Sequence, residues 1–113
     1  MSGISTHVLD LALGKPAAGL MVRLSREEGE GWTEVSTRRT DADGRVKSML
    51  RENEPLERGT YRLRFDTAGY FQTRDIAAFH PFVEVVFEVR NTGEHHHVPL
   101  LVTPHSYSTY RGS

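Results

Sequence analysis

Short runs in which apolar and polar residues alternate, each closed by a turn signal, dominate this sequence and restrict what it can form. A two-residue period places successive side chains on opposite faces of a β-strand, whereas an amphipathic helix repeats roughly every 3.6 residues. About seven or eight such runs, without the strand–helix rhythm of a parallel sheet, are typical of an antiparallel β-sandwich. The predicted fold class is therefore all-β, with two packed sheets.

The predicted strands are separated by Gly, Pro, Asp and Asn, which favour tight turns. Gly14–Pro16 closes the first strand, and Asp41–Gly44 is a turn that delivers a short strand. Asn91–Gly93 turns the chain toward a final pair of strands, whose corner is marked by Pro104 and Ser106. The remaining predicted strands are Ile4–Leu11, Gly19–Ser25 paired with Trp32–Thr37, Arg45–Val46, Thr60–Asp66 and Val83–Val89.

One short helix is predicted within Thr67–Arg74, directly after the fifth of these runs. Asp66 or Thr67 can cap it by accepting hydrogen bonds from the first free backbone N–H groups. Gly69 weakens the helix because glycine has a low helix propensity.

Composition restricts the class of protein. At 113 residues, the chain is predicted to be one domain, residues 1–113. Its net charge of −1 gives no excess of positive charge for binding nucleic acid or an anionic membrane. No cysteine is present, which excludes disulfides and thiolate metal sites. Without a secretory signal or a long apolar run, the expected location is cytoplasmic.

A histidine cluster, His95–His97, opens one of the last strands. Strand parity puts His97 on the face opposite the apolar set Val98, Leu100 and Val102, which is expected to face the core. The same reasoning turns His7 outward on the first strand, because Val8 is the natural core residue. If these strands are neighbours, their outer faces form one patch that contains His7, His97, Ser108 and Tyr110.

Less specific interpretations apply to several of these residues. Histidines at a strand end are usually solvated, and this interpretation is preferred for His95 and His96. His-x-His on a strand can ligate zinc through His95 and His97, although no matching carboxylate or cysteine lies nearby. Asp41–Gly44 looks like the start of a calcium loop but lacks the acidic continuation, so a hairpin turn is preferred.

Five segments spread from end to end of the sequence match one known family: Thr6–Asp10, Gly14–Ala17, Asp43–Arg45, His95–Leu101 and Tyr107–Ser113. Through them the sequence resembles the 5-hydroxyisourate hydrolases, purine-degrading enzymes of the transthyretin-like family. The terminal Tyr-Arg-Gly-Ser is highly specific. Transthyretin itself, a hormone carrier, lacks that ending and the basic trio of the enzymes.

The resemblance implies a transthyretin-like two-sheet antiparallel β-sandwich with one short helix, assembled as a homotetramer, a dimer of dimers. It implies that His7, Arg45 and His97 are the catalytic basic trio. Tyr110 and Ser113 match the tail residues that close the pocket, and Arg111 and Gly112 lie in the same tail. The implied substrate-binding residues are His7, Arg45, Tyr110, Arg111 and Ser113. His96 departs from the family, which often has Tyr there, but its parity points away from the site.

The implied reaction hydrolyses 5-hydroxyisourate to 2-oxo-4-hydroxy-4-carboxy-5-ureidoimidazoline, with no metal and no organic cofactor. His7 and His97 are expected to divide the base and acid roles, in an order that the sequence leaves open. Arg45 is expected to stabilise negative charge on urate-like oxygens. The alternative function is a non-catalytic carrier of small molecules of the transthyretin type, which has no need of three convergent basic groups.

Overall fold

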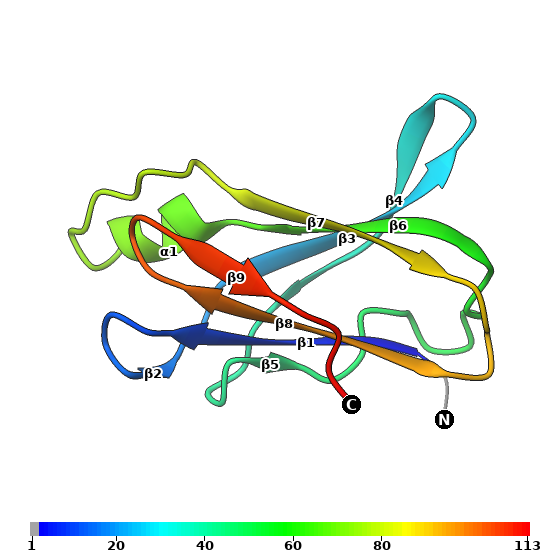
Figure 1. Ribbon diagram of the computed structural model, residues 1–113, viewed down its shortest axis with the longest axis horizontal. Coiled ribbons are helices and arrows are strands. Elements are labelled where there is room, and N and C mark those ends of the chain that lie inside the picture. The colour runs from blue at the N-terminus through cyan, green and yellow to red at the C-terminus, as the bar shows by residue number, and fades with distance from the viewer. Residues whose placement is uncertain (1–2) are drawn as a thin grey trace.

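The computed structural model describes residues 3–113, which form two β-sheets packed face to face with a short helix at one end (Figure 1). In the first sheet the order is β2-β1-β8-β9, and β5 also pairs with β1. Its strands are β1 Gly3–Asp10, β2 Lys15–Pro16, β5 Arg45–Val46, β8 His95–Val102 and β9 Tyr107–Thr109. The second sheet has the order β4-β3-β6-β7, formed by β3 Met21–Glu28, β4 Gly31–Arg39, β6 Gly59–Phe65 and β7 Val83–Val89. The two-sheet sandwich is therefore confirmed.

One feature of the first sheet differs from the antiparallel prediction. Strands β1 and β8 pair in parallel over their whole length, from Gly3 opposite His95 to Asp10 opposite Val102. Alternation within a strand does not report its direction relative to a neighbour that is distant in sequence. The intervening second sheet supplies the long connection that a parallel pair requires. Thr6 strengthens the pair, because its buried Oγ1 donates a hydrogen bond to the Val98 carbonyl over 2.6 Å.

The core lies between the two sheets and follows the predicted parity. Val98, Leu100 and Val102 of β8 are at most 6% exposed. They pack in one cluster with the inward residues of β1 and β6, which include Ile4, Val8, Tyr61, Leu63 and Phe65. Each such side chain contributes about 1.5–3 kcal/mol by leaving water. Burial of this face fixes the register of β8, since a slip of one residue would turn His97 into the core.

The helix, α1 Thr67–Gln72, begins as predicted after Asp66, whose side chain accepts a hydrogen bond from the Gly69 backbone N–H over 3.1 Å. Its buried residues, Thr67, Tyr70 and Phe71, anchor it to the sandwich. No helix within residues 3–113 is long and apolar enough to cross a membrane.

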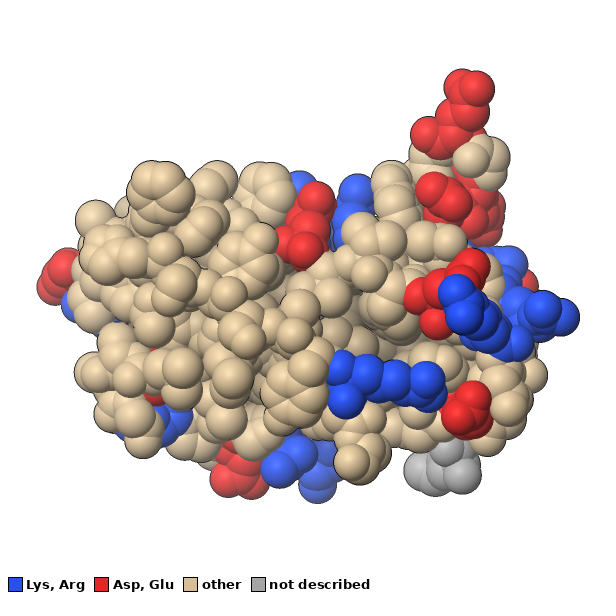
Figure 2. Space-filling model, viewed as in Figure 1, with Lys and Arg blue, Asp and Glu red and all other residues tan. Residues whose placement is uncertain are grey.

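Charge is unevenly distributed over the surface. The β3–β4 hairpin projects from the sandwich and carries acidic side chains at its tip (Figures 1 and 2). Much of the face that includes β9 is uncharged in the same view (Figure 2). Large apolar side chains are exposed on the first sheet and its loops, among them Leu11, Leu13, Tyr107 and Tyr110.

A buried carboxylate, Asp10, ties the first sheet to the helix. It is 0% exposed, and it accepts hydrogen bonds from the backbone N–H groups of Ala12 and Leu13 over 2.9 and 3.0 Å. The Tyr70 hydroxyl donates to its other oxygen over 2.8 Å. Burial, followed by this hydrogen bond and the charge of Asp10, raises the pKa of Tyr70 to about 12, so the hydroxyl remains a donor at neutral pH.

Replacing Asp10 with Ala is expected to lower the free energy of unfolding by about 3 kcal/mol, because two backbone donors and the Tyr70 hydroxyl lose their acceptor. Urea unfolding followed by circular dichroism measures the change. Tyr70→Phe is the matched control: it removes one of the three hydrogen bonds and should destabilise the protein less. If Asp10→Ala lowers the free energy of unfolding by less than about 1 kcal/mol, the prediction is wrong, and water replaces the carboxylate as the hydrogen-bond acceptor.

Candidate active site

Strand pairing brings the predicted basic residues together on the outer face of the first sheet. His7 of β1 lies directly opposite Arg45 of β5 in antiparallel register. On the other side of β1, His97 of β8 lies opposite Ser5, two residues before His7. Residues two apart on a strand share a face, so three neighbouring strands present His7, Arg45 and His97 to one surface.

The turn before β5 positions Arg45. Oδ1 of Asp41 accepts hydrogen bonds from the backbone N–H groups of Asp43 and Arg45, both over 2.9 Å. These bonds favour the charged form of Asp41 and lower its pKa, with that from Arg45 the larger cause. Gly44 has a φ of 74°, and its carbonyl accepts a hydrogen bond from the Val8 N–H over 2.7 Å. A Cβ at Gly44 would collide with the Val8 carbonyl, so only glycine lets the turn approach β1 this closely.

The same turn orients the ring of His7. Its Nε2 lies 3.0 Å from the Asp43 carbonyl oxygen. A carbonyl only accepts, so Nε2 carries the proton and donates it to this bond. In the neutral ring, Nδ1 is therefore the nitrogen with a free lone pair.

The ring of His97 is held between a hydroxyl and the end of the chain. Its Nδ1 lies 2.7 Å from Oγ of Ser5. The Gly112 N–H donates to the His97 carbonyl over 2.9 Å, which aligns the tail along β8. An added Cβ at Gly112 would lie 2.5 Å from Cδ2 of the His97 ring. The bare glycine therefore packs directly against the imidazole.

Burial and nearby cations favour the neutral form of His97. Loss of solvent is the main cause of its lowered pKa, followed by the positive charges of Arg45, His7 and His95. A base with a lowered pKa is largely unprotonated at neutral pH and takes up its proton only as the pH falls further.

The titration of His97 tests this electrostatic description. NMR of its ring resonances should give a pKa below the ordinary value of 6.5. Arg45→Met should raise that pKa, because removal of a nearby cation makes protonation easier. His105→Gln, at the exposed corner between β8 and β9, is the control and should leave it unchanged. A His97 pKa at or above 6.5 in the unmodified protein would contradict the description.

A hollow of about 250 Å³ opens at this face. It brings together two of the predicted catalytic residues, Arg45 and His97, with the predicted tail residue Ser113. The complete lining is Ser5, Thr6, Arg45, Val46, Lys47, His95, His97 and Ser113. His7 is placed beside it by its register opposite Arg45. A small molecule bound in this hollow would contact hydrogen-bond donors, the fixed positive charge of Arg45 and imidazole rings.

Two other predicted substrate-binding residues, Tyr110 and Arg111, line a different hollow of about 200 Å³ between β7 and the β8–β9 edge. The Arg111 guanidinium lies 3.7 Å from the Glu94 carboxylate, and Tyr110 is 57% exposed. His97 lines both hollows. Within one chain, therefore, Arg111 does not line the hollow that contains Arg45 and Ser113.

The preferred interpretation of His95 and His96 as solvated strand-end residues was wrong for His96 and incomplete for His95. His96 is 5% exposed and stacks on Phe87 at 6.4 Å between ring centroids, as its inward parity requires. Burial lowers the pKa of His96, and its Nδ1 has no hydrogen-bond partner among the described residues. His95 is exposed, yet its Nε2 lies 2.7 Å from Oγ of Ser5.

Sequence reasoning missed Ser5 as a member of the site. It lies between the two imidazoles that the zinc alternative would use, and its hydroxyl contacts both. A metal ion held by these two nitrogens would have to displace it. No group of three His, Cys, Asp or Glu side chains in residues 3–113 is arranged to hold a metal ion. The parallel register is what places Ser5 opposite His97.

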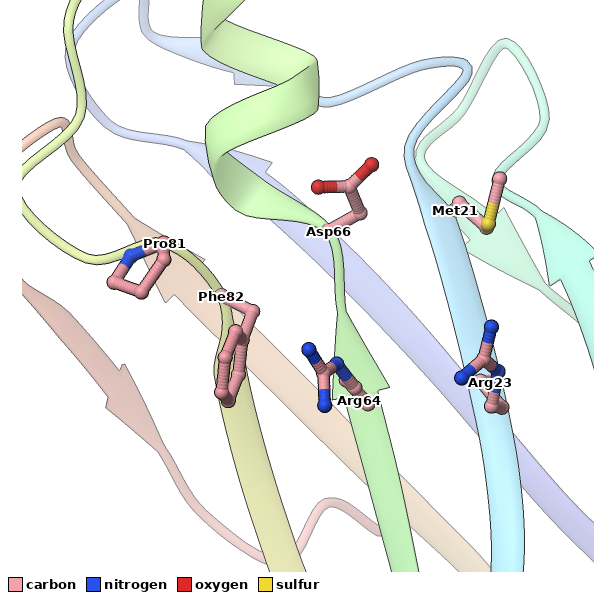
Figure 3. Close-up of a pocket in the computed structure, with 6 residues that line it drawn as sticks. All are labelled: Met21, Arg23, Arg64, Asp66, Pro81 and Phe82. Carbon is pink, nitrogen blue, oxygen red and sulfur yellow. The ribbon is translucent and has the colours of Figure 1, made fainter. Parts of the chain in front are cut away.

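A further hollow, of about 220 Å³, lies on the second sheet and is lined by Met21, Arg23, Arg64, Asp66, Pro81 and Phe82 (Figure 3). Its two guanidinium groups already have partners. Arg64 stacks at 3.6 Å over the Phe82 ring and pairs with Glu84, and Arg23 pairs with Glu34 over 3.2 Å. This hollow has no imidazole in its lining, and none of the predicted catalytic residues lies there.

The fold and the site together define a transthyretin-like sandwich with a basic, imidazole-containing hollow on one outer face. Comparison with known proteins gives the same class: residues 4–112 match the HIUase/Transthyretin family. The chain belongs to this family. Similar proteins named 5-hydroxyisourate hydrolase include that of Deinococcus radiodurans, 51% identical over 98% of this chain and 96% of the relative. That of Caulobacter vibrioides is 50% identical over the full length of both.

Solved structures agree on the fold. The Klebsiella pneumoniae 5-hydroxyisourate hydrolase superposes with a TM-score of 0.87 at 35% identity, covering 99% of this chain and 100% of that one. Transthyretin from Sparus aurata superposes equally well, with a TM-score of 0.90 at 32% identity, covering 99% and 97%. Backbone similarity therefore does not separate the hydrolase from the transthyretin, so any distinction must come from side chains.

Proposed function

We propose that this protein hydrolyses 5-hydroxyisourate in urate degradation, with His7, Arg45 and His97 as its catalytic residues. The observation that carries the proposal is the convergence of two imidazoles and a guanidinium on one outer face. Full-length relatives about half identical to this chain are named for the same activity. The product is 2-oxo-4-hydroxy-4-carboxy-5-ureidoimidazoline.

His97 acts as the base in this mechanism. Its neutral form predominates at neutral pH, and in the tautomer whose Nδ1–H donates to the Ser5 hydroxyl its Nε2 lone pair is free. It removes one proton from a water molecule whose oxygen attacks the acyl carbon of the ring C–N bond. Arg45 donates hydrogen bonds to the oxyanion that forms on the same carbon.

His7 acts as the acid. The Asp43 carbonyl holds its Nε2–H, so Nδ1 carries the second proton of the imidazolium and gives it to the leaving ring nitrogen. The C–N bond then breaks, and the acyl carbon becomes a carboxylic acid. Ionisation of that acid restores the proton of His7, which leaves one proton on His97 for each molecule hydrolysed.

The tail completes the proposed site. Ser113 lines the hollow, and Gly112 seats the tail against the His97 ring. We propose Ser113 as a residue that positions substrate or water. Tyr110 and Arg111 face the neighbouring hollow, and a role for them at the substrate requires that a second chain complete the site there.

We further propose that residues 1–113 are a single hydrolase domain and that four copies assemble as a dimer of dimers. The family match over residues 4–112 and the one continuous core support the first statement. Exposed apolar side chains on the same sheet as the site support the second, since exposed apolar surface marks interaction sites. Those on the first sheet and its loops include Leu11, Leu13 and Tyr110.

Ultraviolet spectroscopy of freshly generated 5-hydroxyisourate, with and without the protein, tests the function. A hydrolase accelerates the decay of this species in proportion to enzyme concentration. A carrier of the transthyretin type would bind the compound and leave its decay unchanged or slower. Unchanged or slower decay in the presence of the protein would refute the proposal and support the carrier alternative.

A further inference from the structure

A single hydroxyl links two imidazoles beside the proposed site. Oγ of Ser5 lies 2.7 Å from Nδ1 of His97 and 2.7 Å from Nε2 of His95. The parallel register of β1 and β8 creates this arrangement, because Ser5 is opposite His97 and Gly3 is opposite His95. Gly3 has no side chain to displace the His95 ring: a Cβ there would lie 3.4 Å from its Nδ1. The two rings and the hydroxyl therefore form one chain of hydrogen bonds.

The hydroxyl proton gives this chain a direction. A serine hydroxyl donates one proton and can accept hydrogen bonds at its oxygen. Ser5 is only 8% exposed, and its hydroxyl has no other partner among the described residues. If both rings donated to it, its own proton would be left without an acceptor in a buried position, which proteins avoid. Ser5 therefore donates to one imidazole and accepts from the other.

The two directions leave different atoms free on His97. If Ser5 donates to Nε2 of His95, it accepts from Nδ1–H of His97, and Nε2 of His97 keeps its lone pair. If Ser5 donates instead to Nδ1 of His97, the proton of the neutral His97 ring is on Nε2. Only the first direction leaves His97 with a nitrogen that can take a proton from water.

The surroundings of the two rings favour the first direction. After loss of solvent, the positive charges of Arg45, His7 and His95 lower the pKa of His97, and Lys47 adds a further cation to the hollow. With Nδ1 held by Ser5, Nε2 is the ring nitrogen that remains for these cations or a ligand. Neighbouring positive charge stabilises a lone pair there and repels an N–H. His95 is exposed, so water can bond to its Nδ1 in either direction.

We propose that Ser5 and His95 fix the tautomer of His97: His95 accepts a hydrogen bond from the Ser5 hydroxyl, and Ser5 accepts one from Nδ1–H of His97. The proposal rests on the proposed function, in which Nε2 of His97 is the base. No proton is transferred along the chain. Nε2 takes a proton from the attacking water and later releases it to solvent from the same atom, so each turnover ends in the tautomer with which it began. Ser5 and His95 contact the base rather than the reacting atoms, so they are positioning residues.

Nitrogen NMR of the histidine rings tests the proposal without turnover, because the shifts of the two ring nitrogens report which one carries the proton. At a pH where His97 is neutral, the Nδ1–H tautomer should predominate in the unmodified protein. Ser5→Ala removes its acceptor and should increase the share of the Nε2–H tautomer. A predominantly Nε2–H His97 in the unmodified protein, or an unchanged ratio in Ser5→Ala, would overturn the proposal.

His95→Lys tests the direction of the chain by kinetics, because an ammonium group donates hydrogen bonds and cannot accept them. We expect kcat to fall about 10-fold, the scale for removing a partner that orients a functional imidazole, with KM nearly unchanged. His95→Gln keeps an acceptor in its amide oxygen and should retain most of the activity. His105→Lys, at the exposed corner between β8 and β9, is the matched control and should be fully active. An unchanged kcat in His95→Lys would count against the proposal.

The double variant Ser5→Ala/His95→Lys separates the hydrogen bond from the added charge. A lysine that acts through Ser5 has no further effect once the hydroxyl is gone, so the double variant should match Ser5→Ala in kcat. Losses of kcat that multiply would show that the lysine acts through its charge alone, and the proposal would be wrong. An unmodified protein with the Nδ1–H tautomer but no acceleration of 5-hydroxyisourate decay would refute the proposed function instead, and with it the role of the tautomer in turnover.

Discussion

Replacing His97 with Asn is expected to lower kcat/KM for 5-hydroxyisourate by about 100-fold or more, the scale of a lost general base. The asparagine amide can still bond to the Ser5 hydroxyl, so the local structure should persist. It has no nitrogen that titrates near neutral pH, and the attacking water would lose its proton acceptor. The effect should therefore appear in the chemical step rather than in folding.

Initial rates of 5-hydroxyisourate decay, measured over a range of substrate concentrations, provide kcat and KM for this variant. His105→Asn serves as the control, because that residue lies at the exposed corner between β8 and β9. Urea unfolding of both variants checks that the fold is retained. Full activity in His97→Asn would remove His97 from the mechanism.

Replacing Gly112 with Val should lower activity about 100-fold, the scale of a misplacement by about 1 Å near the reacting groups. The first added carbon would lie 2.5 Å from Cδ2 of His97 and 3.3 Å from Cγ of Pro99. Either the His97 ring or the tail must move, and a shift of the tail also carries Ser113 out of the hollow. The core between the sheets is not touched, so stability should change little.

The control for this substitution is Gly31→Val, at the start of β4, where an added Cβ meets no atom within 4 Å. Activity and unfolding free energy are measured for both variants. The expected result is an inactive but folded Gly112→Val and a fully active Gly31→Val. An active Gly112→Val would show that the seating of the tail against His97 does not matter for catalysis.

The strands and the helix were predictable because each depends on local chemistry. Alternation located β6, β7 and β8 and, for β8, the residues that enter the core. The Asp41–Gly44 turn was also predicted, as was a helix cap at Asp66 or Thr67, of which Asp66 is the one observed. Both features act through hydrogen bonds to nearby backbone. The direction of β1 relative to β8 was not predicted, because long-range pairing is set by the path of the whole chain.

The candidate site also contains residues that could be predicted from the sequence and residues that could not. Parity turned His7 and His97 to one face, but Ser5 became part of the site only through the parallel register. His96 was expected at the surface, and its burial against Phe87 follows from an inward position on β8 that a strand-end interpretation ignored. In the sequence Asp10 looks like an ordinary residue at the end of a strand, because its hydrogen-bond partner Tyr70 lies 60 residues away along the chain.

Function in this fold is decided by a few side chains rather than by the backbone. The Klebsiella pneumoniae hydrolase and the Sparus aurata transthyretin superpose on this chain with nearly equal scores. A carrier needs no base, acid and fixed cation at one place, whereas the outer face of the first sheet in this chain presents His7, Arg45 and His97 together. The interpretation of this chain as a hydrolase depends on those groups acting together.

The most direct test of that cooperation is kcat/KM for the double variant His7→Asn/His97→Asn, compared with the two single variants. When two groups serve the same step in one site, the losses of kcat/KM on replacing each of them do not add. The kcat/KM of the double variant should therefore be only a little below that of the less active single variant. A loss equal to the product of the two single losses would mean that the imidazoles act independently, and would contradict a shared catalytic site.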